Sequence, residues 1–190
     1  MSRLRRTLGL RSLAPPQGSR RIALFEIIAA VKPLDPDARE RVLEALRDAV
    51  GSELAVAPDA CPITQQDVTD IARRGTLDIG AHTINHLQLS LLDADRQSYE
   101  IEQSARAVAR WTGRTPSLFA YPYGTRSDYD AESVAATRRA GFKAACSNFA
   151  GLVQAKPSLF ELPRLLVRNL PVEDFERLID AAFVAEKSPV

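Results

Sequence analysis

The chain's two histidines, His82 and His86, are the clearest candidates for chemistry, because they lie four residues apart. Two neutral imidazoles at this spacing can bind one divalent ion, from a helix face or from a bend that follows a strand. A zinc-protease helix would require Glu directly after the first histidine, and Thr83 stands there instead. Catalytic zinc normally takes three protein ligands and a water. The pair therefore predicts part of a metal site, and a pair of hydrogen-bonded histidines without metal is the alternative.

An aromatic and proline cluster is the second candidate. It runs Phe119-Ala120-Tyr121-Pro122-Tyr123-Gly124. Pro122 restricts the backbone and Gly124 permits an unusual turn, so the peptide N–H groups around Tyr123 could be held rigidly toward a ligand. A packed aromatic turn that binds nothing is the alternative.

Both candidates follow short strands in the expected secondary structure. Leu77, Ile79 and Ala81 alternate toward His82, and strands are expected at 76–81, 118–121, 142–146 and 162–167. Helical patterns lie between and after them, beginning near Asp93, Asp130 and Val172. This alternation predicts parallel βα units in an open sheet or a barrel. Because such folds keep their sites at the carboxyl ends of the strands, we expect both imidazoles in one cleft near Tyr123.

The amino-terminal third reads as helical rather than βα. Residues 21–57 are expected to hold two helices, the second capped by Asp35, with Pro36 at its first position and Gly51 at its end. A capping-box pattern over 64–67 predicts a further short helix that ends at Gly75.

Composition narrows the class of protein. The 190 residues are 45% apolar and 26% charged, which excludes collagen-like, coiled-coil and wholly disordered chains. The longest apolar runs are too short to span a bilayer. Residues 1–21 carry six arginines and no acid, so the remainder has 19 basic against 24 acidic residues and does not favour a nucleic-acid partner. Residues 1–20 are expected to form a disordered basic arm, and without a secretory signal the default expectation is a cytoplasmic chain.

The motifs in their order resemble the polysaccharide deacetylase family, the NodB homology domain. The segments that carry the resemblance are Arg74 to His86, Phe119 to Gly124, Arg139 to Ala145 and Leu162-Pro163-Arg164. The resemblance implies an α/β fold, an incomplete distorted (β/α) barrel over residues 58–186. It also implies that His82 and His86 bind a divalent metal, zinc being the expected ion. Tyr123 would donate its backbone N–H to the oxyanion, and the saccharide groove would be lined by Tyr121, Pro122, Tyr123 and Gly124.

Several parts of the family pattern are missing. The first motif, a strand ending in Asp-Asp that supplies the general base and a metal ligand, has no counterpart, because the chain contains no Asp-Asp pair. Ala120 replaces the arginine of the third motif, and Leu162-Pro163-Arg164 occupies the approximate place of the fifth motif's histidine. The resemblance thus implies a truncated domain with no general base found and weak metal binding.

The function that the resemblance implies is metal-dependent hydrolysis. The substrate would be a polysaccharide or N-acetylated sugar oligomer that loses N- or O-acetyl groups. The enzyme class would be hydrolases of carbon–nitrogen bonds other than peptide bonds, and the truncation would impair the activity. One alternative is a noncatalytic remnant that binds saccharide through Tyr121 to Gly124. Another is an interaction module whose exposed sheet edge pairs with a partner chain.

Overall fold

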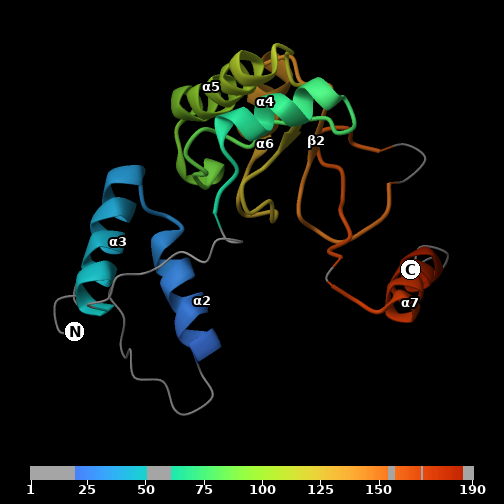
Figure 1. The fold of residues 1–190 in the computed structure, drawn as a ribbon, viewed down its shortest axis with the longest axis horizontal. Helices are drawn as coiled ribbons and strands as arrows, with labels where there is room; N and C mark the ends of the chain where they lie inside the picture. The colour runs from blue at the N-terminus through green and yellow to red at the C-terminus, as the bar shows by residue number, and fades with distance from the viewer. Residues whose placement is uncertain (1–19, 51–60, 154–156, 168, 186–190) are drawn as a thin grey trace. The chain divides into compact units, whose positions relative to one another are not determined.

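The computed structural model describes residues 20–50, 61–153, 157–167 and 169–185. The chain divides into two compact units, Met1–Gln65 and Gln66–Val190. Figure 1 labels their α-helices and one strand, β2. The predicted basic arm over residues 1–20 lies, apart from Arg20, outside the described residues. Within the described part of the chain, no helix combines the length and the apolar character needed to cross a membrane.

The first unit contains two described helices, α2 (Arg20–Val31) and α3 (Pro36–Val50). The predicted cap of α3 is present, because the Asp35 Oδ1 atom accepts the Ala38 backbone N–H at 2.8 Å. Pro36 is the first helical residue, where its missing N–H costs nothing. Residues 51–57 of the predicted helical segment lie outside the described residues.

The second unit holds four α-helices in its described residues. They are α4 (Gln65–Arg74), which begins at the boundary of the units, α5 (Ala94–Thr112), α6 (Ala131–Arg139) and α7 (Val172–Ala185). A short 3₁₀ turn, η2 (Leu89–Leu91), precedes α5. Asp93 caps α5 by accepting the Arg96 backbone N–H, and Gly113 ends the helix with a φ of 70°. The helices predicted near Asp93, Asp130 and Val172 are therefore confirmed.

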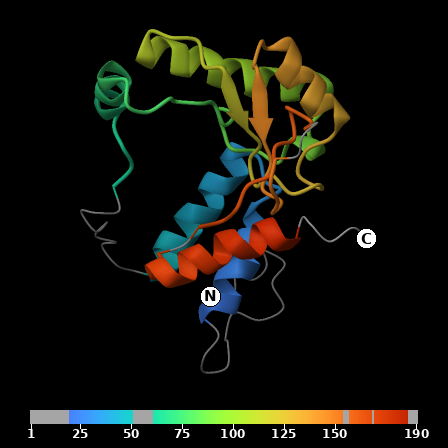
Figure 2. The same ribbon diagram turned by 90° about the vertical axis from the view of Figure 1, so that its right-hand side faces the viewer.

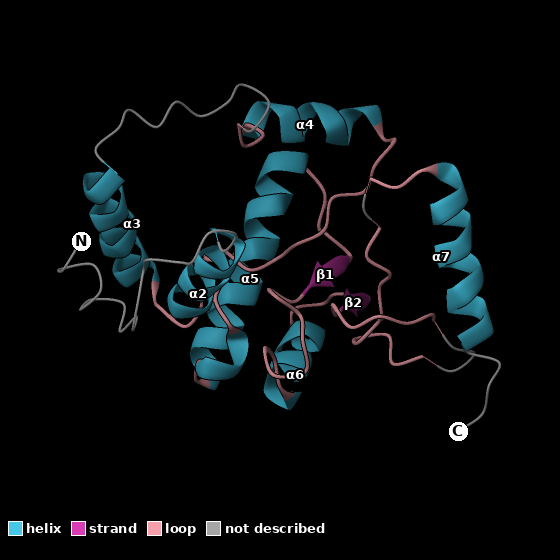
Figure 3. Ribbon diagram, turned by 90° about the horizontal axis from the view of Figure 1, so that it is seen from below, coloured by secondary structure: helices cyan, strands magenta, loops and turns pink. Residues whose placement is uncertain are grey.

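A small parallel sheet lies at the centre of this unit. Strands β1 (Leu118–Ala120) and β2 (Ala144–Cys146) pair in parallel with Phe119 opposite Ala145, and Figures 2 and 3 show them side by side. Ala81 forms a parallel bridge to Phe119, and Leu162 forms one to Cys146. Four extended segments thus lie next to one another in chain order, which is the arrangement expected of sequential βα units.

The two outer strands are shorter than predicted. The expected strands over 76–81 and 162–167 are each reduced to a single bridged residue, Ala81 or Leu162. Leu162 bonds β2 through both its N–H and its carbonyl, so the next residue that faces β2 is Arg164. The ladder ends there, because the Arg164 backbone N–H donates to the Phe149 carbonyl, while the Ser147 carbonyl accepts the Arg164 side-chain Nε–H at 2.6 Å. On the other side Leu77 is 64% exposed, so no burial of its side chain favours a longer strand there.

The core of the unit is aromatic and packs around the sheet. Its buried members include five aromatic side chains, Phe119, Tyr121, Tyr129, Phe142 and Phe160. Ile101 and Val108 contribute the apolar face of α5 to the same cluster, and α5 also contacts α6. This packing fixes the strand ends, where the candidate residues lie.

Candidate active site

The candidate residues lie where the extended segments end. His82 follows the bridged residue Ala81, and the Tyr121-to-Gly124 turn follows β1. Because the segments run in parallel, their carboxyl ends share one edge of the sheet. Segments nearly forty residues apart in the sequence therefore meet at this edge.

The structure brings His82, His86 and Tyr123 together. The two imidazole centroids lie 4.8 Å apart, with the rings edge to face at 78°. The His86 ring is also edge to face with the Tyr123 ring, at a centroid distance of 4.7 Å. The expected proximity of the three side chains is present, while their roles as ligands and oxyanion donor stay predictions.

A backbone carbonyl orients the His82 ring. Its Nδ1 atom lies 2.7 Å from the carbonyl oxygen of Ala120. A carbonyl can only accept, so in the neutral imidazole Nδ1 carries the proton and the lone pair is on Nε2. In metal-binding histidines, the ring nitrogen that does not bind the metal commonly donates its N–H to a carbonyl or carboxylate. This hydrogen bond fixes both the tautomer and the orientation of the ring.

The loop between the two histidines has strained backbone. Thr83 and His86 both adopt left-handed φ angles, 60° and 52°. The His86 backbone N–H donates to the Thr83 hydroxyl oxygen at 3.0 Å. The carboxylate of Glu100, on α5, accepts from the backbone N–H and the side-chain amide of Asn85 at 2.9 and 2.8 Å. Hydrogen bonds to side chains therefore offset the cost of the conformation.

Tyr123 lies at the centre of a tight turn. The Gly124 N–H donates to the Pro122 carbonyl at 2.6 Å, which closes a three-residue γ-turn around Tyr123 with a φ of 60°. Gly124 also has a positive φ, and a Cβ placed on it would come within 2.8 Å of the Asn148 backbone nitrogen. The turn is thus held in one geometry against the segment that follows β2.

The predicted saccharide-lining residues do not all reach the surface. Tyr121 and Pro122 are fully buried. The Tyr121 ring stacks on Tyr129 with centroids 4.1 Å apart, and its hydroxyl donates to the Phe160 carbonyl at 3.0 Å. Burial raises the pKa of Tyr121 to about 12. The Tyr121 side chain belongs to the core, and of the two tyrosines in the motif only Tyr123 presents its ring to the histidines.

Carboxylates do not complete a metal site in the described part of the chain. No group of three or more His, Cys, Asp or Glu side chains there could hold a metal ion. The two imidazoles fit as two ligands of a divalent ion, but the donor set is one short of the three usual in catalytic zinc sites. A buried acid, Glu100, is hydrogen-bonded to the loop between the histidines. Its carboxylate accepts the Asn85 backbone N–H and lies 3.6 Å from the Arg96 guanidinium.

Sequence reasoning missed the Asn85–Glu100 pair. The available signal was a glutamate directly before Ile101, on the apolar stripe of a long helix, where an unpaired charge would be costly. Asn85, between the two histidines, was the matching donor. Neither residue type suggests the pairing alone, because it joins positions fifteen apart across a turn.

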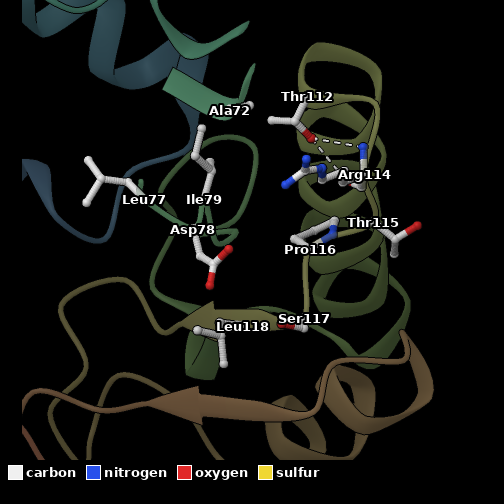
Figure 4. A pocket seen from close by; sticks show the side chains of 10 residues that line it. All are labelled: Ala72, Leu77, Asp78, Ile79, Thr112, Arg114, Thr115, Pro116, Ser117 and Leu118. Atoms are coloured by element: carbon white, nitrogen blue, oxygen red, sulfur yellow. Dashed lines mark hydrogen bonds between the residues drawn. The ribbon is translucent and has the colours of Figure 1, made fainter. Parts of the chain in front are cut away.

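Two cavities flank the segment before His82. A cavity of about 240 Å³ is lined by residues 79–84, which include His82 and Thr83, by Val68 of α4, and by residues of α5 that include Val108 and Trp111. The second, of about 90 Å³, lies beside the start of β1 at the opposite end of the segments (Figure 4), where Asp78 and Arg114 are among its lining residues. A cavity of the second size admits a few waters and no sugar ring.

Comparisons with known proteins agree on one family. A sequence model of the polysaccharide deacetylase family matches residues 41–145. YxkH of Bacillus subtilis strain 168, named as a polysaccharide deacetylase, is 24% identical over 105 residues, which are 55% of this chain and 36% of YxkH. The chain therefore spans about a third of the length of that relative.

Solved structures show the same fold. The Streptococcus pyogenes deacetylase PplD, solved with acetate, superposes with a TM-score of 0.56 at 20% identity over 64% of this chain and 52% of PplD. The Bacillus cereus polysaccharide deacetylase BC0361 superposes with a TM-score of 0.55 at 19% identity over 78% of this chain and 48% of BC0361. The sheet described above is thus part of a barrel of this type. Because the sequence model covers more than half of its residues, the chain belongs to the polysaccharide deacetylase family.

Proposed function

We propose that the chain serves in the removal of N- or O-acetyl groups from a polysaccharide, through a divalent-metal site built on His82 and His86, with zinc as the expected ion. The observation that carries this proposal is the oriented imidazole pair. The rings are in contact, and the Ala120 carbonyl holds His82 in the tautomer that leaves Nε2 as the donor to a ligand. A divalent ion held there would supply Lewis-acid polarisation of the acetyl carbonyl.

The chain's own residues would bind and orient the acetyl group. Tyr123 contacts the His86 ring, and its backbone N–H is proposed to donate to the oxyanion that forms during hydrolysis. The γ-turn and the close packing of Gly124 against Asn148 support this role, because an oxyanion donor is effective only when it is held before the reaction.

Low turnover by this chain is part of the proposal. The described residues offer no third metal ligand, and the fully buried Glu100 is committed to Asn85. Losing a general base typically costs about 10²- to 10⁴-fold in rate. The same observation favours a second candidate, a noncatalytic saccharide-binding chain that uses the Tyr123 surface.

The first experiment measures zinc binding by titration calorimetry. We expect weak binding that His82→Ala abolishes. Cys61→Ser is the matched control, because Cys61 is an exposed thiol that could bind zinc by itself. Binding that survives His82→Ala, or that disappears in Cys61→Ser, would place the metal away from the histidine pair.

The second experiment measures acetate release from an N-acetylglucosamine oligomer. We expect turnover well below about 1 per second, the low end of usual enzyme rates. Adding an amino-terminal strand that ends in Asp-Asp should raise it, in a manner that requires His82. Turnover near 1 per second by the unaltered chain would show that an acid within it acts as the base. The second candidate would be favoured if the oligomer binds and Tyr123→Ala abolishes that binding, while neither the unaltered chain nor the chain with the added strand releases acetate.

A further inference from the structure

A fully buried glutamate on α5 supports the loop that joins the two histidines. Glu100 has no exposed surface. Its Oε2 atom accepts the Asn85 backbone N–H at 2.9 Å, and its Oε1 atom accepts the Asn85 side-chain amide at 2.8 Å. The Arg96 guanidinium lies 3.6 Å from the same Oε1. Both oxygens of the carboxylate therefore accept hydrogen bonds from Asn85.

We propose that Glu100 is a positioning residue, which sets the separation of the His82 and His86 rings by holding Asn85. The inference rests on the proposed function of the two histidines as a metal-binding pair. His82 is tied to the end of β1 through the Ala120 carbonyl, and the residue before His86 is tied to α5 through Glu100. The spacing of the rings is thus set by how α5 packs on β1, through a shared core that includes Ile101 and Phe119.

Backbone strain explains why the loop needs such an anchor. Thr83 and His86 are non-glycine residues with positive φ, a conformation that persists only where neighbouring contacts over-determine it. Asn85 lies directly before His86, so its two bonds to Glu100 fix the approach to the strained residue. Burying a carboxylate is costly unless it is fully hydrogen-bonded, and here the bonds that compensate it go to the histidine loop.

The test uses a donor–acceptor swap. Glu100→Gln keeps the shape of the side chain but turns an amide NH₂ toward one of the two Asn85 donors. The double variant Asn85→Asp/Glu100→Gln restores complementary pairing, because the glutamine oxygen can accept the backbone N–H while its amide donates to the new carboxylate. Glu102→Gln is the control on the same helix, since Glu102 is partly exposed and pairs with Arg106 at 3.3 Å.

Two readouts report ring geometry separately from activity. The chain has only two histidines, so imidazole NMR of the metal-free protein shows two ring systems. We expect a nuclear Overhauser effect between the rings that Glu100→Gln weakens and the swap recovers. Zinc affinity measured by calorimetry should fall by about ten- to a hundredfold in Glu100→Gln, the usual effect of losing an outer-shell partner, and recover in the swap.

The positioning role would be overturned if Glu100→Gln lowers the thermal midpoint but leaves the zinc affinity and the nuclear Overhauser effect between the imidazole rings unchanged. If Glu100→Gln does not fold, Asn85→Ala decides, because it removes the side-chain bond from the loop without altering α5. If the parent chain binds no zinc, the proposed metal site fails, and the ring-to-ring effect still tests the positioning role alone.

Discussion

At the scale of single residues, backbone strain gathers at the candidate site. In the described part of the chain the non-glycine residues with positive φ are Thr83, His86 and Tyr123, and all three belong to the two motifs. Such conformations cost about 1–3 kcal/mol each and recur where a side chain or an N–H must be held in one direction. The distribution of strain therefore points to the same residues as the chemistry does.

Gly124→Ala should destabilise the protein strongly, with a fall in unfolding free energy of about 3 kcal/mol or more, which combines left-handed strain with a steric clash. The new Cβ would lie 2.8 Å from the Asn148 backbone nitrogen, and relieving this clash would require a shift of the backbone. Gly113→Ala is the matched control, because Gly113 has nearly the same φ, 70° against 71°, with open space around it. Denaturant unfolding checks the difference, and equal losses in the two variants would contradict the clash.

At the scale of secondary-structure elements, caps decide where helices begin. The Asp130 carboxylate accepts the Ser133 N–H at 2.9 Å, and the Ser133 hydroxyl oxygen accepts the Asp130 N–H at 3.2 Å, which completes a capping box at α6. The Ser133 hydroxyl also donates to Gln97 of α5 at 2.6 Å. The cap of one helix is therefore part of its contact with the next.

Asp130→Ala should lower the unfolding free energy by about 1–2 kcal/mol, because it removes the cap and half of the box. Glu132→Ala in the same first turn should change it by less than about 0.5 kcal/mol, since Glu132 makes a surface pair with Arg139. Thermal and denaturant unfolding measure both variants. A loss in Glu132→Ala as large as that in Asp130→Ala would show that first-turn charge, rather than the cap, governs α6.

At the scale of the whole molecule, the aromatic core of the second unit joins segments that are distant in the sequence. Tyr121, directly after β1, stacks on Tyr129 and donates its hydroxyl hydrogen to the Phe160 carbonyl. Burial raises the pKa of Tyr121 to about 12. Burial, and then the hydrogen bond to Glu161, also raise the pKa of Tyr129 above its usual range. The core therefore depends on both phenols staying neutral.

Stability should fall as pH rises from about 10 to 12, the window between the ordinary pKa of a tyrosine and the raised pKa of Tyr121. Below pH 10 the folded and unfolded chains both keep the phenol protonated, so its contribution is fully present. Above it the unfolded chain ionises first, and about 2–3 kcal/mol is lost by pH 12. Tyr121→Phe should make the loss of stability with pH shallower. Tyr99→Phe is the control, because Tyr99 is a half-exposed residue of α5. An unchanged slope in Tyr121→Phe would refute this.

The sequence by itself determined the helices, the parallel βα order and the two motifs that meet at the site. Helix starts at Asp35 and Asp93 were predictable because a cap is a local interaction, made within three residues. Strand lengths at Ala81 and Leu162 were not, because a strand extends only as far as a distant segment offers backbone partners. The tertiary structure alone buried Tyr121 in the core and paired Glu100 with Asn85. Both outcomes depend on contacts between elements, which periodicity within one element does not encode.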